Sequence, residues 1–180
     1  MRLEVIFFLI RVVGAVFVVA GCAGIGFYKS TEITKRIAVL KEMHRLLLIL
    51  KGEISYLAQP VPEAAAQAAL RGSGRFAQFF QKIADRLYEK NGETFAKIWC
   101  SCIDLYFGDC CLKEEDFRLF YNIGENIGFL DRQTQVQALE LYMENLKTNI
   151  LYLSETAAAK QRVYKCMGAF FGLMAVILLI

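Results

Sequence analysis

The sequence has few of the residues that enzyme active sites use. His44 is its only histidine, so few nucleophile–base pairs can form. The sequence also lacks the Gly-x-x-x-x-Gly-Lys-Ser/Thr and Gly-x-Gly-x-x-Gly phosphate loops and the Gly-x-Ser-x-Gly nucleophile elbow. We therefore predict a protein that is not an enzyme and has no catalytic residue, cofactor, metal or small-molecule substrate. The alternative is a small membrane-bound enzyme that uses Cys100, Cys102 or His44.

A strong excess of one charge is also absent. The formal net charge is +3, and the sequence has neither a block of Lys and Arg nor basic residues interleaved with aromatic ones. Nucleic-acid-binding domains show such patterns, so we expect no nucleic-acid partner. The hydrophobic fraction of 56% is high for a soluble protein, and much of it lies at the two ends of the chain. The length of 180 residues leaves room for one domain of ordinary size.

The spacing of the six cysteines is a poor match to known metal sites. Cys22 and Cys166 lie in the apolar end segments, and the other four lie in the middle of the chain at Cys100, Cys102, Cys110 and Cys111. In a helix, Cys100 and Cys102 lie roughly 200° apart and cannot both face one metal ion. A zinc site built from the four central cysteines is the alternative. Free thiols in a reducing compartment explain these cysteines better.

No stretch of the sequence alternates as a strand would, and apolar residues recur at helical spacing throughout. Residues 33–57 predict a long amphipathic helix, continuous with the N-terminal apolar segment, on whose apolar stripe His44 is packed. Pro60 and Pro62 end this helix and open a short one over 63–70. Further helices are predicted at 76–87, at 95–106, from 113–116 onward, and from 136 towards 164, with Asp131 as a cap. The fold class is therefore all-α, a bundle of about six helices.

Charged residues are expected on the solvent faces of these helices. The acidic residues of the segment Lys113–Asp116 suit a helix N-terminus, where they interact favourably with the helix dipole. We interpret them as a solvated first turn rather than as a metal or catalytic cluster.

The two ends of the chain predict transmembrane helices at 1–28 and 163–180, on either side of a helical domain at 29–162. Residues 163–180 would form roughly 27 Å of helix, which is short for a membrane span. Small residues repeat at a four-residue spacing in the pairs Ala20/Gly24, Cys22/Gly26 and Gly168/Gly172, and this spacing lets membrane helices pack closely. Because the working part lies before Val163, we expect no domain beyond the C-terminal helix.

The charges that flank the two spans predict the orientation of the central domain. Basic residues follow the first span at Lys29, Lys35 and Arg36, and others precede the second at Lys160 and Arg162. The positive-inside rule therefore places residues 29–162 in the cytoplasm.

The alternative is an exported lipoprotein with a helical binding domain, since Val19–Cys22 reads as a lipobox. Glu4 in the leader, the apolar residues after Cys22 and the basic cluster after them argue against export.

Four groups of residues, in this order and spacing, carry a resemblance to a known family. They are Gly26-Phe27-Tyr28, then Glu53-Ile54-x-Tyr56 with Pro60-Val61-Pro62-Glu63-Ala64, then Ile123-Gly124-x-x-Ile127-Gly128-x-Leu130-Asp131-x-x-x-Gln135, and finally Tyr164-x-x-Met167-Gly168-x-x-x-Gly172. Over nearly its whole length, the chain resembles the stage III sporulation protein AB family of endospore-forming bacteria. It departs from the family pattern in its four central cysteines and in Ile123 and Met167, where Leu is usual.

The resemblance implies a non-enzymatic component of the channel-like complex that joins mother cell and forespore. The family is similar to the inner-membrane platform proteins of type II secretion and type IV pilus machines, whose cytoplasmic domains are six-helix bundles. Such a platform lies in the lipid bilayer of the mother-cell membrane facing the forespore. There it links a cytoplasmic secretion-type ATPase to other channel and ring proteins. The resemblance leaves open whether the protein also associates with itself.

The candidate partner contacts are two surfaces, the Tyr56–Glu63 turn and the Gly124–Gln135 corner. Their residues are Tyr56, Pro60, Pro62, Glu63, Gly124, Gly128, Asp131 and Gln135. In the alternative interpretation, the same residues serve only the fold, as a proline turn and a helix junction.

Overall fold

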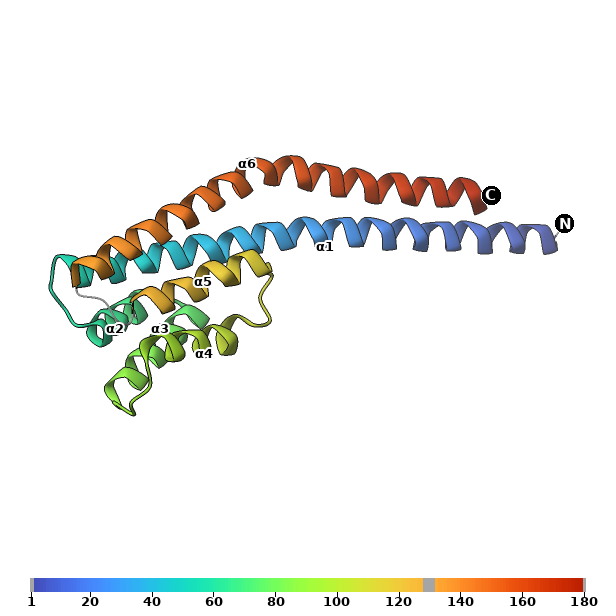
Figure 1. Ribbon diagram of the computed structural model, residues 1–180. Coiled ribbons are helices and arrows are strands. Elements are labelled where there is room, and N and C mark those ends of the chain that lie inside the picture. Colours follow the sequence, from blue (N-terminus) through green and yellow to red (C-terminus); the bar gives the residue numbers. More distant parts are fainter. Residues whose placement is uncertain (1, 128–131, 180) are drawn as a thin grey trace. The chain divides into compact units, whose positions relative to one another are not determined.

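The computed structural model describes residues 2–127 and 132–179, and in the outer parts of the first and last helices it describes the side chains of only a few residues. All secondary structure in this part of the chain is helical. The six helices are α1 (Arg2–Ser55), α2 (Val61–Arg71), α3 (Gly74–Tyr88), α4 (Phe95–Phe107), α5 (Glu114–Ile127) and α6 (Arg132–Leu179) (Figure 1). The predicted all-α fold with six helices, of which the first and last are the longest, is confirmed.

The chain divides into two compact units. Residues 36–152 form one, called the bundle unit below, and residues 1–35 with 153–180 form the other, called the terminal unit. Most side chains of the predicted spans 1–28 and 163–180 lie outside the described residues. For the side chains that are described, no helical stretch reaches the combined length and hydropathy that a membrane-crossing segment requires.

In the bundle unit, α1 contributes one apolar face. Its buried residues recur every three or four positions, at Leu40, Met43, Leu47, Leu50 and Ile54. Helix α2 packs on α3, α3 on α4, and α4 on α5 (Figure 1). Consecutive helices therefore pack as neighbours, as short connections favour.

The core of the bundle unit is rich in aromatic rings. Trp99 of α4 is fully buried, with its ring centroid 5.1 Å from that of Phe79 and 6.0 Å from that of Phe80 on α3. Both pairs meet edge to face, which is a favoured geometry for aromatic rings. The indole Nε1 of Trp99 donates a hydrogen bond to the carbonyl oxygen of Phe120 on α5, at 2.8 Å. Trp99 thus joins three helices.

Helix α1 ends earlier than the apolar pattern predicts. It stops at Ser55, and Leu57, predicted as the last residue of the apolar stripe, is 62% exposed. The reason is a turn in which Ala58 takes the left-handed conformation, with φ of 55°. The backbone N–H of Gln59 then donates to the carbonyl oxygen of Glu53, at 3.1 Å. Pro60 follows, and Pro62 lies in the first turn of α2, as predicted.

Candidate partner-binding surfaces

The Tyr56–Glu63 turn presents side chains to solvent at the end of α1. Tyr56 is 87% exposed, and Pro60 is also exposed. Pro62 and Glu63 are half-buried in the first turn of α2, where the Glu63 carboxylate suits the positive end of the helix dipole. Pro60, Pro62 and Glu63 thus lie at the start of α2, and Tyr56 lies just after the end of α1.

Two oxygen atoms at this turn are buried without a hydrogen-bond donor among the described residues. They are Oε1 of Gln59 and Oε2 of Glu63. Glu63 also lies beside Tyr88 at the end of α3: desolvation, and then the charge of Glu63 and its hydrogen bond, raise the pKa of Tyr88. Tyr88 therefore belongs to this surface, although sequence reasoning did not single it out.

The second predicted surface makes internal contacts where the structure describes it. Gly124 is buried within α5, and a Cβ built on it would lie 2.4 Å from Cδ1 of Trp99. The side chain of Gln135 donates from Nε2 to the carbonyl oxygen of Ile127, at 3.0 Å, and so caps the end of α5 from the first turn of α6. Gly128 and Asp131, the latter predicted as a cap, lie outside the described residues.

A buried ion pair that sequence reasoning missed joins α1 to α5. Arg36 donates from Nε to Oδ2 of Asp116 at 2.6 Å and from Nη2 to Oδ1 at 2.8 Å. Asn149 of α6 donates to Oδ1 at 3.2 Å, and the backbone N–H of Lys113 donates to Oδ2 at 2.9 Å. Four donors thus match the acceptor capacity of one carboxylate, which is 0% exposed.

This cluster corrects two expectations. Asp116 was predicted in a solvated first turn, but it is buried, whereas its acidic neighbours Glu114 and Glu115 are exposed. Charged residues were predicted on solvent faces, but Arg36, Glu53 and Asp116 are buried. The burial of Arg36 could have been predicted from its position in the helix. Arg36 lies four residues before the buried Leu40 and therefore on the same face of α1.

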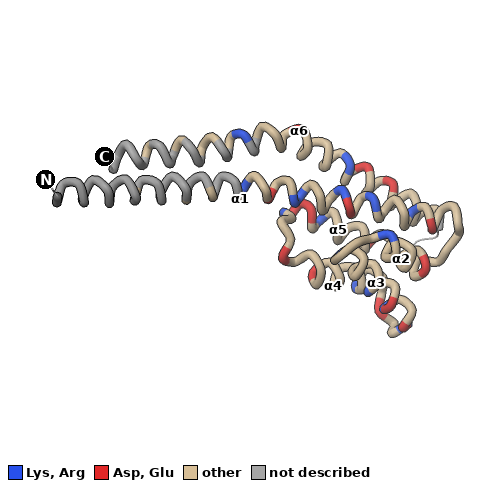
Figure 2. The backbone as a smooth tube through the Cα atoms, turned by 180° about the vertical axis from the view of Figure 1, so that it is seen from behind, with Lys and Arg blue, Asp and Glu red and all other residues tan. Residues whose placement is uncertain are grey.

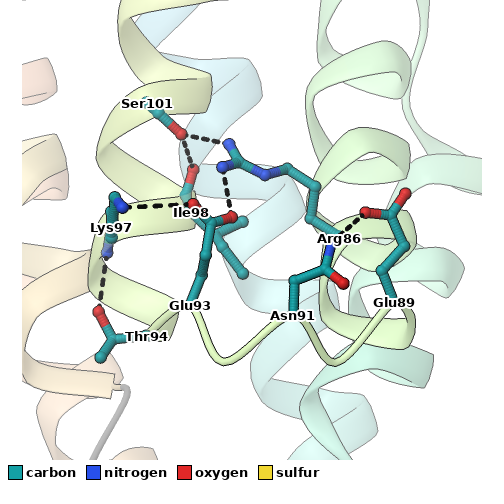
Figure 3. Close-up of polar contacts among 8 residues, drawn as sticks. All are labelled: Arg86, Glu89, Asn91, Glu93, Thr94, Lys97, Ile98 and Ser101. Carbon is teal, nitrogen blue, oxygen red and sulfur yellow. Dashed lines mark hydrogen bonds and ion pairs between the residues drawn. The ribbon is translucent and has the colours of Figure 1, made fainter.

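A second polar cluster closes the connection between α3 and α4 (Figure 3). The guanidinium of Arg86 donates to Oγ of Ser101 and to Oε2 of Glu93, both at 2.5 Å. Lys97 pairs with Glu93 at 3.5 Å, and its backbone N–H donates to the Thr94 side chain, which caps α4. These residues stabilise a helix connection, and each charge has an opposite partner.

The residues proposed for the enzymatic alternative lie in unfavourable surroundings for thiol chemistry. Burial is the main cause that raises the pKa of the thiols of Cys100 and Cys102, which disfavours the reactive thiolate. Burial, followed by the charge of Lys147, lowers the pKa of His44. The described cysteines, Cys100, Cys102, Cys110, Cys111 and Cys166, are free thiols.

The glycines predicted for membrane packing lie in α1 and α6. A Cβ built on Gly24 would meet no atom within 4 Å, so the described residues leave space around this position. For Gly26, Gly168 and Gly172 the surroundings lie outside the described residues.

Charges of both signs are interspersed along the parts of α1 and α6 that belong to the bundle unit (Figure 2). Lys51 of α1 pairs with Glu140 of α6 at 2.5 Å, and Arg45 pairs with Glu42 within α1 at 2.6 Å. Such mixed charge is typical of a solvated protein surface.

Comparisons with known proteins agree with this architecture. The family model described as stage III sporulation protein AB matches residues 11–180. A Bacillus subtilis (strain 168) protein named stage III sporulation protein AB is 23% identical over 171 residues, which cover 95% of this chain and 99% of that protein. A solved structure titled stage III sporulation protein AB (SpoIIIAB) has a TM-score of 0.62 at 19% identity, over 69% of this chain and 97% of that one, and so shares its fold.

The matched model covers well over half of the chain. The name of the family refers to a stage of sporulation and not to an enzymatic reaction. The chain therefore belongs to the stage III sporulation protein AB family and has a role in sporulation.

Proposed function

We propose that this protein is a non-enzymatic membrane platform in the channel complex between mother cell and forespore. Its bundle unit lies in the cytoplasm of the mother cell and binds a secretion-type ATPase. Its apolar ends lie in the membrane that faces the forespore and contact the membrane and ring components of the channel. The protein binds these partners and transmits force or position between them, without turning over a substrate.

The continuity of the two long helices is the observation that carries this proposal. Helix α1 is one helix from Arg2 to Ser55, and α6 is one helix from Arg132 to Leu179. Each contains both a face of the bundle unit and one of the apolar terminal segments. A partner that pushes on the bundle unit therefore acts on helices that continue into the segments we assign to the membrane.

The Arg36–Asp116 cluster suits such a role. It joins α1, α5 and α6 within the bundle unit through four hydrogen bonds to one carboxylate. A satisfied buried polar network makes a core more rigid and more specific in its packing. We assign partner contact to the exposed Tyr56–Glu63 turn. In the corner, Gly124 allows α5 to pack closely on α4, and Gln135 of α6 caps the end of α5.

In the membrane, we propose that Gly24, Gly26, Gly168 and Gly172 provide faces for close helix packing. The space around Gly24 supports this assignment, because a neighbouring helix needs room to approach the backbone. The neighbour is the other terminal helix, a second copy of the chain or another channel protein.

Two experiments test the proposed function. In a deletion strain, we expect normal engulfment followed by arrested forespore development, and unimpaired sporulation would refute the role. An alkaline phosphatase fusion at Gly92, in the connection after α3, tests the orientation: inactive fusions are expected, whereas active ones would place the bundle unit outside. In that case Cys22→Ala would decide for the lipoprotein if it abolished a lipid-dependent shift in mobility.

A further inference from the structure

The connection between α3 and α4 contains an asparagine that is followed by a glycine, Asn91-Gly92. The amide group of an asparagine can be lost as ammonia when the backbone nitrogen of the next residue attacks the side-chain amide carbon. Glycine favours this reaction, because it has no Cβ beside the attacking nitrogen and restricts the backbone least. The other asparagines each precede a bulky isoleucine or leucine; they are Asn122, Asn126, Asn145 and Asn149. The sequence therefore sets Asn91 apart from them.

The fold leaves the attacking group accessible. Asn91 and Gly92 are both exposed and both lie outside the helices. Gly92 has φ of 73°, in the left-handed region that glycine adopts readily. Among the described residues, no backbone carbonyl accepts a hydrogen bond from the N–H of Gly92. The backbone nitrogen of Gly92 is therefore not engaged in the hydrogen-bonded helices on either side of it.

The side chain of Asn91 is held only at the surface. Its Nδ2 donates a hydrogen bond to Oε2 of Glu89, at 3.0 Å (Figure 3). Both residues are exposed, so water competes for this bond and its net contribution to stability is small. The amide of Asn91 can therefore leave Glu89 and turn towards the nitrogen of Gly92 without unfolding of the neighbouring helices.

We propose that Asn91 is a site of spontaneous deamidation in the folded protein. Hydroxide takes the N–H proton of Gly92, and the nitrogen attacks Cγ of Asn91 to close a succinimide ring. The bond from Cγ to Nδ2 breaks, and Nδ2 takes a proton from water and leaves as ammonia. Water then opens the ring at either of its carbonyl groups, which gives aspartate or isoaspartate at position 91. Water is consumed and ammonia is released, and no oxidant or reductant takes part.

The product changes the connection between α3 and α4. The amide of Asn91 donates to Glu89, whereas a carboxylate can only accept, so this hydrogen bond is lost and two negative charges lie close together. Isoaspartate also lengthens the backbone by a methylene group, between the helices that carry Phe79 and Trp99. This chemistry needs neither a membrane nor a partner, so it does not depend on the proposed function.

The test uses the full-length chain in detergent micelles, incubated at mildly alkaline pH, then digested and analysed by mass spectrometry. We expect the peptide that contains Asn91 to gain the mass that replaces an amide by a carboxyl group, while the peptides with the other asparagines stay unchanged. Enzymatic methylation of isoaspartate identifies the ring intermediate, because direct hydrolysis of the amide gives aspartate alone. The rate should rise with hydroxide concentration, since the N–H of Gly92 must lose its proton.

Gly92→Ala should slow the reaction at Asn91 at least ~5-fold, because a Cβ crowds the attacking nitrogen. The matched control is Gly52→Ala in α1, where a Cβ meets no atom within 4 Å, and it should leave the rate unchanged. Unfolding midpoints show whether each variant folds. If Gly92→Ala does not fold, the wild-type chain in urea decides: the folded chain should react within ~5-fold of the unfolded one, since an exposed connection with few contacts imposes little constraint.

An Asn91 that stays intact in the folded chain but reacts in the unfolded one would overturn the inference, because the fold would then hold the amide away from Gly92. Aspartate without isoaspartate, or an unchanged rate in a folded Gly92→Ala variant, would also overturn it. The outcome is separate from that of the deletion strain, which tests the platform and not this reaction.

Discussion

Gly124 of α5 lies directly against the indole of Trp99 on α4. A Cβ on Gly124 would lie 2.4 Å from Cδ1 and 2.8 Å from Cβ of Trp99, distances that no carbon atoms tolerate without a shift. Trp99 is fully buried and hydrogen-bonded to Phe120 through its indole nitrogen, so it has little freedom to move. The absence of a side chain at Gly124 therefore sets how closely α4 and α5 pack.

Gly124→Ala should destabilise the chain by about 1–3 kcal/mol, because the added methyl group overpacks the contact with Trp99. The measurement is denaturant-induced unfolding of the purified full-length chain, followed by the fluorescence of this single tryptophan. The matched control is Gly52→Ala in α1, where a Cβ meets no atom within 4 Å. This control should be neutral or more stable by up to about 1 kcal/mol, as helix propensity predicts. Equal effects of both variants would contradict the assigned contact.

Asp116→Ala should destabilise the chain by about 3–5 kcal/mol, because it leaves the buried Arg36 guanidinium without its charge partner. The double replacement Arg36→Met with Asp116→Leu should restore most of that loss, since apolar residues of similar volume often replace a buried pair without cost. Unfolding free energies in a double-mutant cycle measure the coupling.

The control for this pair is its neighbour. Glu115 also approaches Arg36, at 3.9 Å, but its side chain is 80% exposed. Glu115→Ala should therefore change the free energy of unfolding by less than about 1 kcal/mol. A large effect there, or a small one at Asp116, would show that the pair does not anchor α1 to α5.

Lys90→Gly should stabilise the chain by roughly 0.5–1 kcal/mol. Lys90 follows the end of α3 with φ of 49°, the left-handed conformation in which glycine avoids the steric cost of a Cβ. Thermal unfolding measures the gain, and Lys82→Gly, inside α3, should instead destabilise by about 1 kcal/mol. A loss of stability in both variants would mean that the Lys90 side chain makes contacts that outweigh the strain.

The hydrogen bond from the Tyr121 hydroxyl to the Asp104 carboxylate joins α5 to α4 and makes stability depend on pH. This bond, followed by desolvation, raises the pKa of Tyr121 to about 12 from an ordinary value of 10.0. The folded chain therefore holds this proton more tightly than the unfolded chain. The contribution is complete below about pH 10 and falls as pH rises to about 12.

Tyr121→Phe should remove this dependence. Below pH 10, the variant should be less stable by well under 1 kcal/mol, because the pair is largely exposed to solvent. The difference should vanish towards pH 12. Unfolding measured across this range, together with tyrosinate absorbance, tests the assignment; a difference that grows with pH would contradict it.

Most of the helices could be predicted from local signals. The aromatic residues Phe76, Phe79 and Phe80 recur at helical spacing, and the two prolines and the glycines mark the ends of helices. These signals act over a few residues, and the structure follows them closely. The end of α1 was predicted wrongly because Ala58 adopts a left-handed conformation. The sequence gives no sign of this conformation, since alanine usually continues a helix.

The contacts that join the helices could not be predicted in this way. Arg36 and Asp116 are 80 residues apart in sequence, and each has an ordinary surface interpretation on its own helix. Both charged side chains can be buried only because they pair with each other in the folded protein. The same holds for Gly124, whose partner Trp99 lies on another helix, and for Glu63 beside Tyr88. At the candidate turn, the sequence indicated the residues, while the unpartnered acceptors became visible only in three dimensions.

The position of Asp116 also bears on how the chain is made. During synthesis, Arg36 leaves the ribosome long before Asp116, which follows 80 residues later, and Asn149 follows later still. Until then, the Arg36 guanidinium on α1 lacks the carboxylate that neutralises it in the folded protein. Contacts over such separations close late in folding. A nascent chain stalled before residue 116 would thus carry Arg36 without its charge partner, and the link between α1, α5 and α6 is completed only when Asn149 has also been made.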